Sequence, residues 1–315
     1  MAKKRMFPLI GMVLLLGCGA PSSDKAPSPD GGISLSGAFA LYPLTVKWAE
    51  EFKKTHPDAK IDISAGGAGK GITDVLAGVT NIGLVSRSLT LEEIQKGATP
   101  IAVTRDAVVP TISASNPLLK QLQARGIKRD EFSAIFITGQ TKTWSQLGLG
   151  SDAPIHVYTR SDAAGAAETW AAYLGKKQDD LQGVAVFGDP GQAQAVKKDP
   201  AGIGFNNIVF VYDANSKQPS NGVVPVPIDL NGNGKIDPEE NFYGTIDQIT
   251  QAIAQGKYPS PPARDLYFVI KDSLTNPLAK AFINWVLTEG QKYVQAAGYI
   301  NLPPERLTEG LNKAK

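Results

Sequence analysis

The stretch GISLSGAFALYPLTVKWAEEFKKTHP, Gly32 to Pro57, joins a short strand pattern, a turn of small residues and an amphipathic helix pattern. Leu44, Trp48 and Phe52 recur at intervals of four residues, which places them on one helix face. Pro43 suits the first turn of that helix, because no backbone N–H is needed there. A strand followed by such a helix is the building unit of an α/β fold.

The same order continues along the chain. KIDIS, a glycine turn, ITDVLAGVT and NIGLVSRSL extend it to β-α-β-α-β, and a second series includes PIHVYTR, ETWAAYLG, GVAVFG and GIGFNNIVFVYD. IAVTRDAVVPTIS is a long apolar run that could pass between the two series, and NPLLKQLQARGIKRDEF is typical of a surface helix. We therefore expect an α/β protein with two lobes, mostly parallel sheets, helices on both faces and an interlobe cleft. Lobe 1 would comprise residues 32–107 and 264–315, and lobe 2 residues 108–263.

The composition is that of a globular protein. The 315 residues suffice for two domains, and 42% of them are hydrophobic and 20% charged. The formal net charge is +2, and there is no long run of like charge. We therefore expect no nucleic-acid partner.

The N-terminus has the pattern of a signal peptide. MAKKR is positive, and the twelve apolar residues MFPLIGMVLLLG are too few to span a bilayer. LLGC, which ends at Cys18, resembles the bacterial lipobox; the alternative is an ordinary signal peptide with an incidental cysteine. We expect residues 1–18 to be a lipoprotein signal peptide with its lipidation cysteine, so that cleavage before Cys18 leaves it as the acylated first residue. A flexible tether over residues 19–31 would follow, in a membrane-anchored protein facing the periplasm or the cell exterior. Because Cys18 is the one cysteine, an intramolecular disulfide is excluded.

Three predicted strand-to-helix junctions share one chemistry. They are LSGAFALYP (35–43), SAGGAGKGI (64–72) and TRSDAAGAAETW (159–170). Each places small residues just before a helix, where free backbone N–H groups and the helix dipole favour an anion. One such junction is weak support, because tight turns need glycine anyway; three together predict an anion site.

These junctions and other segments together resemble the phosphate-binding proteins of bacterial phosphate ABC importers. The resemblance is carried by Gly37 with LYPLTVKWAEEF, the GGAG turn, IGLVSRSL, TRSD, GIGF and the C-terminal INWVLTEGQKYVQAAGYINL, and it covers nearly the whole mature chain. It implies the two-lobed type II periplasmic solute-binding fold, which closes on its ligand.

The resemblance also implies a set of site residues. Arg160 would contact the oxyanion, Asp162 would orient its guanidinium, and Gly165 would offer a backbone N–H. Several positions depart from the family, which has hydroxyl residues where this chain has alanine or glycine. Arg87 or Lys70 could supply charge in their place, unless both are solvated or paired with nearby carboxylates. The expected ligand set is Ala40, Gly66, Ser86, Arg87, Arg160, Asp162, Ala164, Gly165 and Ala166.

The segment DLNGNGKIDPEE, residues 229–240, matches the register of an EF-hand calcium loop. Gly234 would allow the sharp turn, and Ile236 would point inward. The segment VVPVPI before it is extended chain and not an entering helix, which predicts a single structural Ca²⁺ site; the alternative is a solvated loop without metal. The expected ligands are Asp229, Asn231, Asn233, Lys235 through its carbonyl, Asp237 and Glu240.

An enzyme is not expected. His56 and His156 are the two histidines, neither lies in a metal-ligand pattern, and no nucleophile accompanies the anion site. We expect a monomeric, lipid-anchored solute-binding protein that captures phosphate for the permease of an ABC importer, and expect Arg160→Ala to abolish binding with the fold intact. The alternatives are a receptor for another oxyanion or an organic acid, and a calcium-stabilised surface lipoprotein without a transport role.

Overall fold

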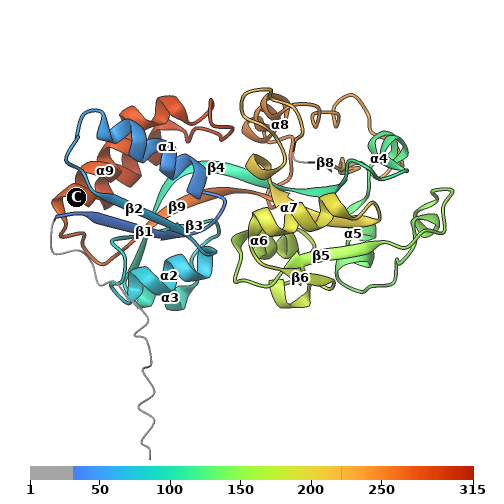
Figure 1. Cartoon of the computed structure of the whole chain (residues 1–315), viewed down its shortest axis with the longest axis horizontal. Coiled ribbons are helices and arrows are strands. Elements are labelled where there is room, and N and C mark those ends of the chain that lie inside the picture. The colour runs from blue at the N-terminus through green and yellow to red at the C-terminus, as the bar shows by residue number, and fades with distance from the viewer. Residues whose placement is uncertain (1–30, 221) are drawn as a thin grey trace, which may run out of the picture.

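Two α/β lobes joined by extended strands make up the described part of the chain (Figure 1). The computed structural model describes residues 31–220 and 222–315. The signal segment 1–18 with Cys18, and the tether up to residue 30, lie outside the described residues. None of the helices in the described part is both long and apolar enough to cross a bilayer.

The strands and helices alternate through most of the chain. The strands are β1 (Ile33–Gly37), β2 (Ile61–Ala65), β3 (Ile82–Val85), β4 (Ala98–Ser113), β5 (His156–Arg160), β6 (Val184–Val186), β7 (Gly202–Asn207), β8 (Val223–Pro225) and β9 (Ala263–Lys271). The α-helices are α1 (Tyr42–Lys53), α2 (Ala68–Leu76), α3 (Leu91–Gln95), α4 (Leu119–Arg125), α5 (Arg129–Phe136), α6 (Gly165–Tyr173), α7 (Gly188–Lys198), α8 (Ile246–Ala254), α9 (Pro277–Leu287) and α10 (Pro304–Lys313). Four 3₁₀ helices among the described residues are η1 (Trp144–Leu147), η2 (Gln178–Asp180), η3 (Ile208–Phe210) and η4 (Glu289–Tyr293).

The described strands form one continuous hydrogen-bonded path through both lobes, in the order β2-β1-β3-β9-β4-β7-β5-β6, with β8 beside β4. β1 pairs in parallel with β2 and β3, and β5 pairs in parallel with β6 and β7. Every pair that involves β4 or β9 is antiparallel. The expected two-lobed α/β fold is confirmed, but the parallel pairing is confined to the outer strands, because β4 and β9 run in opposite directions between the lobes.

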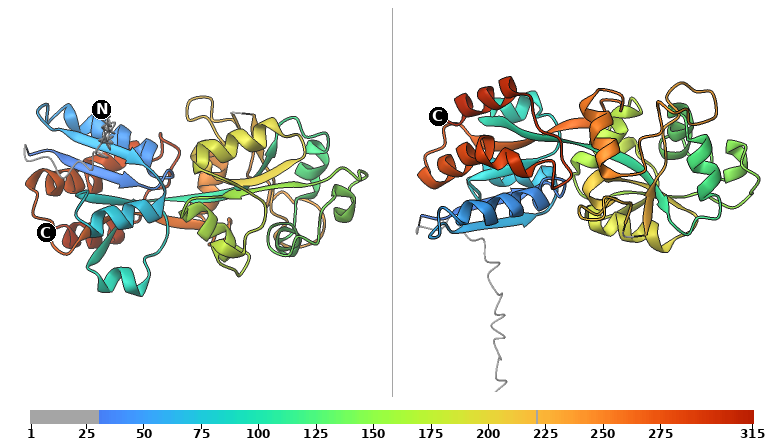
Figure 2. Two further views of the ribbon diagram at one scale, coloured as in Figure 1. Left: turned by 60° about the horizontal axis from the view of Figure 1, so that its bottom comes forward. Right: turned by 90° about the horizontal axis from the view of Figure 1, so that it is seen from above.

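β4 and β9 connect the lobes (Figure 2). β4 pairs with β9 as far as Ala107 opposite Ala263, and from Val108 onward it pairs with β7. The buried hydrophobic side chains form two clusters that divide at the same place, although Ile300 packs with the lobe 2 cluster. We therefore keep 108–263 as the proposed extent of lobe 2.

The predicted helix face of α1 is confirmed. Leu44, Trp48 and Phe52 are fully buried, and the indole N–H of Trp48 donates to the carbonyl of Gly290 at 2.8 Å. In Figure 1, α1 and α9 lie above the strands of lobe 1, and α2 and α3 lie below them. This two-sided cover buries β1 and β3, whereas the edge strand β2 stays partly exposed. The ends of the strands are left to face lobe 2.

The surface helix expected from NPLLKQLQARGIKRDEF is two helices. α4 ends at Arg125, Gly126 adopts φ +69°, and α5 begins at Arg129. The side chains of Phe132 and Phe136 on α5 are fully buried. The positive φ of Gly126 ends α4 and turns the chain, so that the second helix packs into the core of lobe 2.

Candidate functional site

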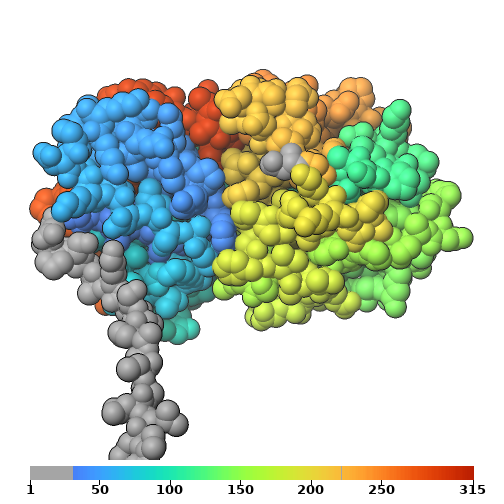
Figure 3. All heavy atoms as spheres, viewed as in Figure 1, coloured from blue at the N-terminus to red at the C-terminus, as the bar shows by residue number. Residues whose placement is uncertain are grey.

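The three predicted helix-opening turns meet in the cleft between the lobes. The turn before α2 belongs to lobe 1, and the N–H of Gly69 donates across the cleft to the carbonyl of Ala163, before α6, at 3.1 Å. Figure 3 shows the atoms of the two lobes in contact along this face. The structure therefore has the lobes closed over the N-terminus of α6.

The two turns of lobe 1 are bonded to each other. The carbonyl of Gly37, after β1, accepts the N–H groups of Gly66 at 2.9 Å and Gly67 at 3.1 Å. Gly37 has φ +137°, and a Cβ there would lie 2.2 Å from the carbonyl oxygen of Leu84. Glycine is required at this position, because both the backbone angle and the close approach of β3 exclude a side chain.

The start of α6 packs directly against lobe 1. A Cβ at Gly165 would lie 2.2 Å from the Oγ of Ser86, and a Cβ at Gly67 would lie 2.8 Å from Oδ2 of Asp162. Within residues 31–220 and 222–315, no acceptor is paired with the N–H groups of Gly165 and Ala166. These two donors, at the positive end of a helix dipole, can serve an anion.

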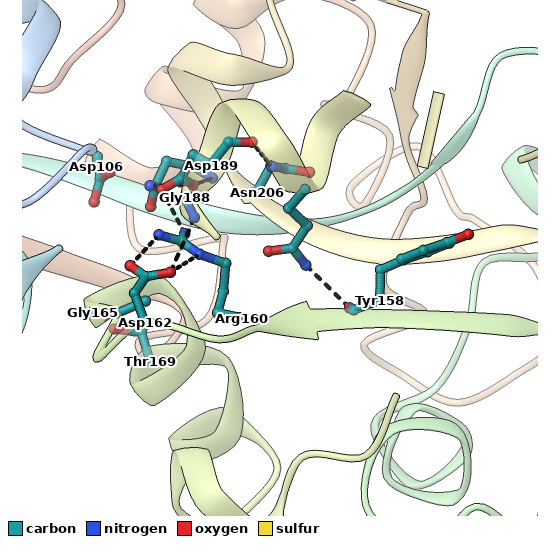
Figure 4. Close-up of polar contacts among 12 residues, drawn as sticks. Asp106, Tyr158, Arg160, Asp162, Gly165, Thr169, Gly188, Asp189 and Asn206 are labelled. Atoms are coloured by element: carbon teal, nitrogen blue, oxygen red, sulfur yellow. Dashed lines mark hydrogen bonds and ion pairs between the residues drawn. The ribbon is translucent and has the colours of Figure 1, made fainter. Parts of the chain in front are cut away.

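Arg160 ends β5 and lies between two carboxylates (Figure 4). Its Nε and Nη2 donate to Asp162 at 2.9 and 2.7 Å, and its Nη1 donates to Asp189 at 2.6 Å. The Arg160 side chain is only 1% exposed. Three of the five N–H donors of the guanidinium are thus committed, and the other two have no acceptor in the described part of the chain.

The charge of Arg160 is more than balanced. Asp189 also accepts from the side-chain amide of Asn207 at 2.6 Å, and Arg264 pairs with buried Asp106 at 2.9 Å. Burial opposes the charge on Arg160, but the neighbouring aspartates prevail and raise the pKa of its guanidinium. Burial also raises the pKa of Asp106, against the effect of Arg264. With every group ionised, two arginines face three aspartates, so an incoming anion meets no excess of positive charge.

Two residues that the sequence reasoning missed complete this arrangement. The ring of Phe39, from lobe 1, lies over the Arg160 guanidinium at 5.6 Å and packs edge-on against Phe187 at 5.8 Å. Asp189, in the first turn of α7, supplies the second carboxylate. The acidic residue in Gly188–Asp189 was a visible signal for a helix start, but no sequence pattern indicates that Phe39 covers Arg160.

Most of the expected ligand residues lie around this point, with different roles. Ser86, Gly66, Asp162, Gly165 and Ala166 adjoin the junctions described above. The N–H of Ala164 is already taken by Oε1 of Gln178 at 3.1 Å, and the carbonyl of Ala40, before α1, accepts the Tyr299 hydroxyl at 2.7 Å.

The two cations considered as replacements for hydroxyl groups are both paired. Lys70 forms an ion pair with Asp74. Arg87 donates to both oxygens of Glu93, at 2.9 and 2.6 Å, and its Nε lies 3.0 Å from Glu168 of lobe 2. This matches the alternative in which nearby carboxylates pair with both cations.

The loop 229–240 is closed by its own hydrogen bonds. Asp229 accepts the N–H groups of Gly232 at 2.7 Å and Gly234 at 2.8 Å, and Glu240 accepts the N–H of Asn231 at 3.0 Å. Asp237 lies 2.7 Å from the Lys235 ammonium. In the described part of the chain, no group of three or more His, Cys, Asp and Glu side chains is placed to hold a metal. A cation here would therefore need the amide and carbonyl oxygens of the loop as well.

Comparison with known proteins gives the family. A model described as a PBP superfamily domain matches residues 22–289. The chain belongs to this superfamily. It is 27% identical to the phosphate-binding protein PstS of Bacillus subtilis over 96% of this chain and 94% of the relative. It is also 27% identical to the phosphate-binding protein PstS of Methanocaldococcus jannaschii, over 97% of this chain and 91% of the relative.

Solved structures share the superfamily's fold. A putative phosphate ABC transporter substrate-binding protein from Clostridium perfringens, with bound phosphate, superposes with a TM-score of 0.71 at 25% identity. The superposition covers 86% of this chain and all of that one. An ABC-type phosphate transport receptor from Vibrio cholerae gives a TM-score of 0.61 at 22% identity, over 86% of this chain and all of the receptor.

Replacement of Arg160 by alanine tests the buried cluster. Because the change leaves Asp162 and Asp189 buried without a cation, we expect the free energy of unfolding to fall by about 3–5 kcal/mol in denaturant titrations. This revises the expectation from the sequence that the fold would be unaffected. Lys96→Ala, which removes an exposed ion pair with Glu92, should leave the unfolding midpoint unchanged. Equal midpoints for both variants would contradict a stabilising role for Arg160.

Proposed function

We propose that the chain is an extracytoplasmic solute-binding protein that captures phosphate, or a similar tetrahedral oxyanion, and delivers it to the permease of an ABC importer. The names of the relatives in two distant organisms, and the phosphate-bound structure from Clostridium perfringens, support phosphate over the other candidates. The observation that carries the proposal is that the N–H groups of Gly165 and Ala166 have no acceptor among the described residues and follow Asp162, the partner of Arg160, by three and four residues. Such proteins bind and release their ligand and catalyse no reaction.

Backbone amides are the main anion donors in this proposal. The alanines at 164 and 166 lack the hydroxyl groups expected from the family resemblance, but the N–H groups of the helix start remain. A hydrogen bond to a charged group contributes about 1.5–3 kcal/mol. Arg160, neutralised by its aspartates, adds directional N–H donors more than net charge. The ligand is therefore held chiefly by dipoles aligned before it arrives.

Closure of the lobes completes the site. Arg160 and the start of α6 belong to lobe 2, whereas Ser86 and the turn around Gly66 belong to lobe 1. A ligand that contacts both lobes binds the closed form more tightly than the open form and shifts the population toward it. The permease can then distinguish loaded from empty protein by its shape.

Ala166→Pro tests the amide donors directly. The change removes one N–H from the second position of α6, where proline is compatible with a helix. We expect isothermal titration with inorganic phosphate to show binding about tenfold to a hundredfold weaker than in the unchanged protein.

Glu305→Pro is the matched control, because it removes an N–H from the same position of α10, away from the cleft. Phosphate affinity should be unchanged in this variant. If Ala166→Pro binds phosphate as tightly as the control, the amide proposal is wrong; if the unchanged protein binds no phosphate or related oxyanion, so is the proposed function.

We also propose that Cys18 carries the lipid anchor, on the support of the LLGC pattern at the end of the signal segment. A lipid anchor on Cys18 would keep the binding protein at the membrane, close to its permease. Cys18→Ser should move the protein from the membrane fraction to the soluble fraction after expression in a bacterial host, as judged by immunoblot of the two fractions. Unchanged fractionation would contradict the anchor.

The loop 229–240 is proposed to bind one structural Ca²⁺. The match to all ligand positions of the EF-hand register supports this, as does the burial of Asp229 and Glu240, which are 3% and 5% exposed. Calcium at a hundred times its Kd would stabilise the fold by about 2.7 kcal/mol. We expect the melting temperature to rise with Ca²⁺ relative to chelator, and Glu240→Gln to abolish the difference.

Glu239→Gln is the control for calcium, because Glu239 is exposed and occupies a position that contributes no ligand in this register. Its melting temperature should respond to Ca²⁺ like that of the unchanged protein. Identical melting of the unchanged protein with calcium and with chelator would rule out a structural calcium ion.

A further inference from the structure

Arg87 lies between two carboxylates that come from opposite lobes. It follows β3 in lobe 1 and donates to both oxygens of Glu93, on α3 of the same lobe. The Nη1 of Arg87 also donates a hydrogen bond to the carbonyl oxygen of Ser88 at 2.9 Å. Its Nε faces Glu168, on α6 of lobe 2, at 3.0 Å. The contact with Glu168 exists only while the lobes are closed, whereas the contacts with Glu93 and Ser88 lie within lobe 1.

The three charged groups carry a net negative charge. Glu93 already neutralises Arg87 through two hydrogen bonds, and Glu168 then brings a second negative charge to the same guanidinium. A half-exposed ion pair contributes about 0–1 kcal/mol at best. Against that small gain stand the partial dehydration of Glu168 in the cleft and its repulsion by Glu93.

Glu168 also borders a cavity of about 470 Å³ on the flank of α6, lined on the other side by residues of β4 and β9. Five other charged or titratable side chains line this cavity with Glu168: Arg87, Arg105, Arg264, Asp265 and Tyr267. Glu93 does not line the cavity but also acts on the charge of Glu168. Arg264 is committed to Asp106 and Arg105 to Asp265, so neither is a free partner for Glu168. Arg87 and Arg264 therefore offset the Glu168 charge only in part, because each is already paired with another carboxylate.

We infer that ionised Glu168 opposes lobe closure, so that capture and release of the ligand are linked to the uptake and loss of a proton at this side chain. The inference deepens the proposed function and rests on it, since the closed form is the one that holds the ligand. Glu168 touches no proposed ligand donor and acts through the lobes. It lies three residues after Gly165 on α6, so that closure moves the ligand site and Glu168 together.

The direction of the linkage follows from the balance of these effects. Burial raises the pKa of Glu168 in the closed form, with Glu93 acting in the same sense, while Arg87 and Arg264 oppose them. Opening of the cleft would rehydrate the carboxyl and move its pKa back toward that of an ordinary glutamate. The closed form thus binds the proton at Glu168 more tightly than the open form, so protonation of Glu168 favours closure. The opposition of ionised Glu168 to closure is fully present above the pKa that Glu168 has in the closed form.

Glu168→Gln tests the inference, because glutamine keeps the shape of a protonated carboxyl and cannot ionise. Isothermal titration with inorganic phosphate should be run on both proteins from pH 8 to about pH 4, below the ordinary pKa of a glutamate. Taking the ratio of the two Kd values at each pH cancels the titration of phosphate itself. We expect the variant to bind about two- to tenfold more tightly at pH 7.5, with slower release in stopped flow, and the ratio to fall toward one only as the pH drops below about 4.3, the ordinary pKa of a glutamate.

Glu92→Gln is the matched control. It removes the same charge from a neighbouring position on α3, where Glu92 is 75% exposed and paired with Lys96. Its Kd should follow that of the unchanged protein at every pH. Weaker binding by Glu168→Gln would show that the Arg87 contact favours closure, and a ratio of one at pH 7.5 would show that it has no effect; either result overturns the inference.

Small-angle scattering of the ligand-free proteins separates this inference from the proposed function. If Glu168 opposes closure, the variant should be more compact than the unchanged protein at pH 7.5, and the difference should disappear only at about pH 4, where Glu168 is protonated in both forms. This difference does not depend on the identity of the ligand. If neither protein binds phosphate, the scattering result alone decides the inference: indistinguishable radii of gyration at pH 7.5 would refute it.

Discussion

One buried guanidinium organises the candidate site. Arg160 is bonded to Asp162 and Asp189, and Asp162 also accepts the N–H of Gly188 at 3.1 Å. The ion pairs therefore connect the end of β5 with the starts of α6 and α7. A buried charge is tolerated only with partners of this kind, so the positions of both helix starts depend on the same cluster.

This cluster also determines how an anion can be bound. Because two carboxylates already share the guanidinium, no excess of positive charge is available there to attract an anion. Among the described residues, the donors left without an acceptor include the N–H groups of Gly165 and Ala166 and two N–H groups of Arg160. The loss of side-chain hydroxyl groups at Ala164 and Ala166 is compatible with binding for this reason, since the amide donors are held by the helix itself.

Local patterns predicted much of the fold from the sequence. The spacing of Leu44, Trp48 and Phe52 gave the buried face of α1, and the small-residue junctions gave the three turns that meet in the cleft. Local patterns did not predict the change of partner along β4 or the break at Gly126, because neighbouring strands and helices decide both. The sequence resemblance supplied the family, which the superfamily match confirms.

The partners of charged side chains were the harder part of the site. Lys70 and Asp74 are four residues apart on one helix, so their pairing could be anticipated. The pairing of Arg160 with Asp189 spans 29 residues and depends on the packing of α7 against β5. The contact between Arg87 and Glu168 joins two lobes and depends on closure. A sequence shows where charges occur, but only the tertiary structure shows which of them neutralise one another.

The most direct test of the account is a crystal structure of the protein with phosphate. We expect phosphate oxygens within hydrogen-bond distance of the N–H groups of Gly165 and Ala166, with Arg160 still bonded to both Asp162 and Asp189. Phosphate bound elsewhere, or an Arg160 that leaves its aspartates to form a free ion pair with the ligand, would contradict the account.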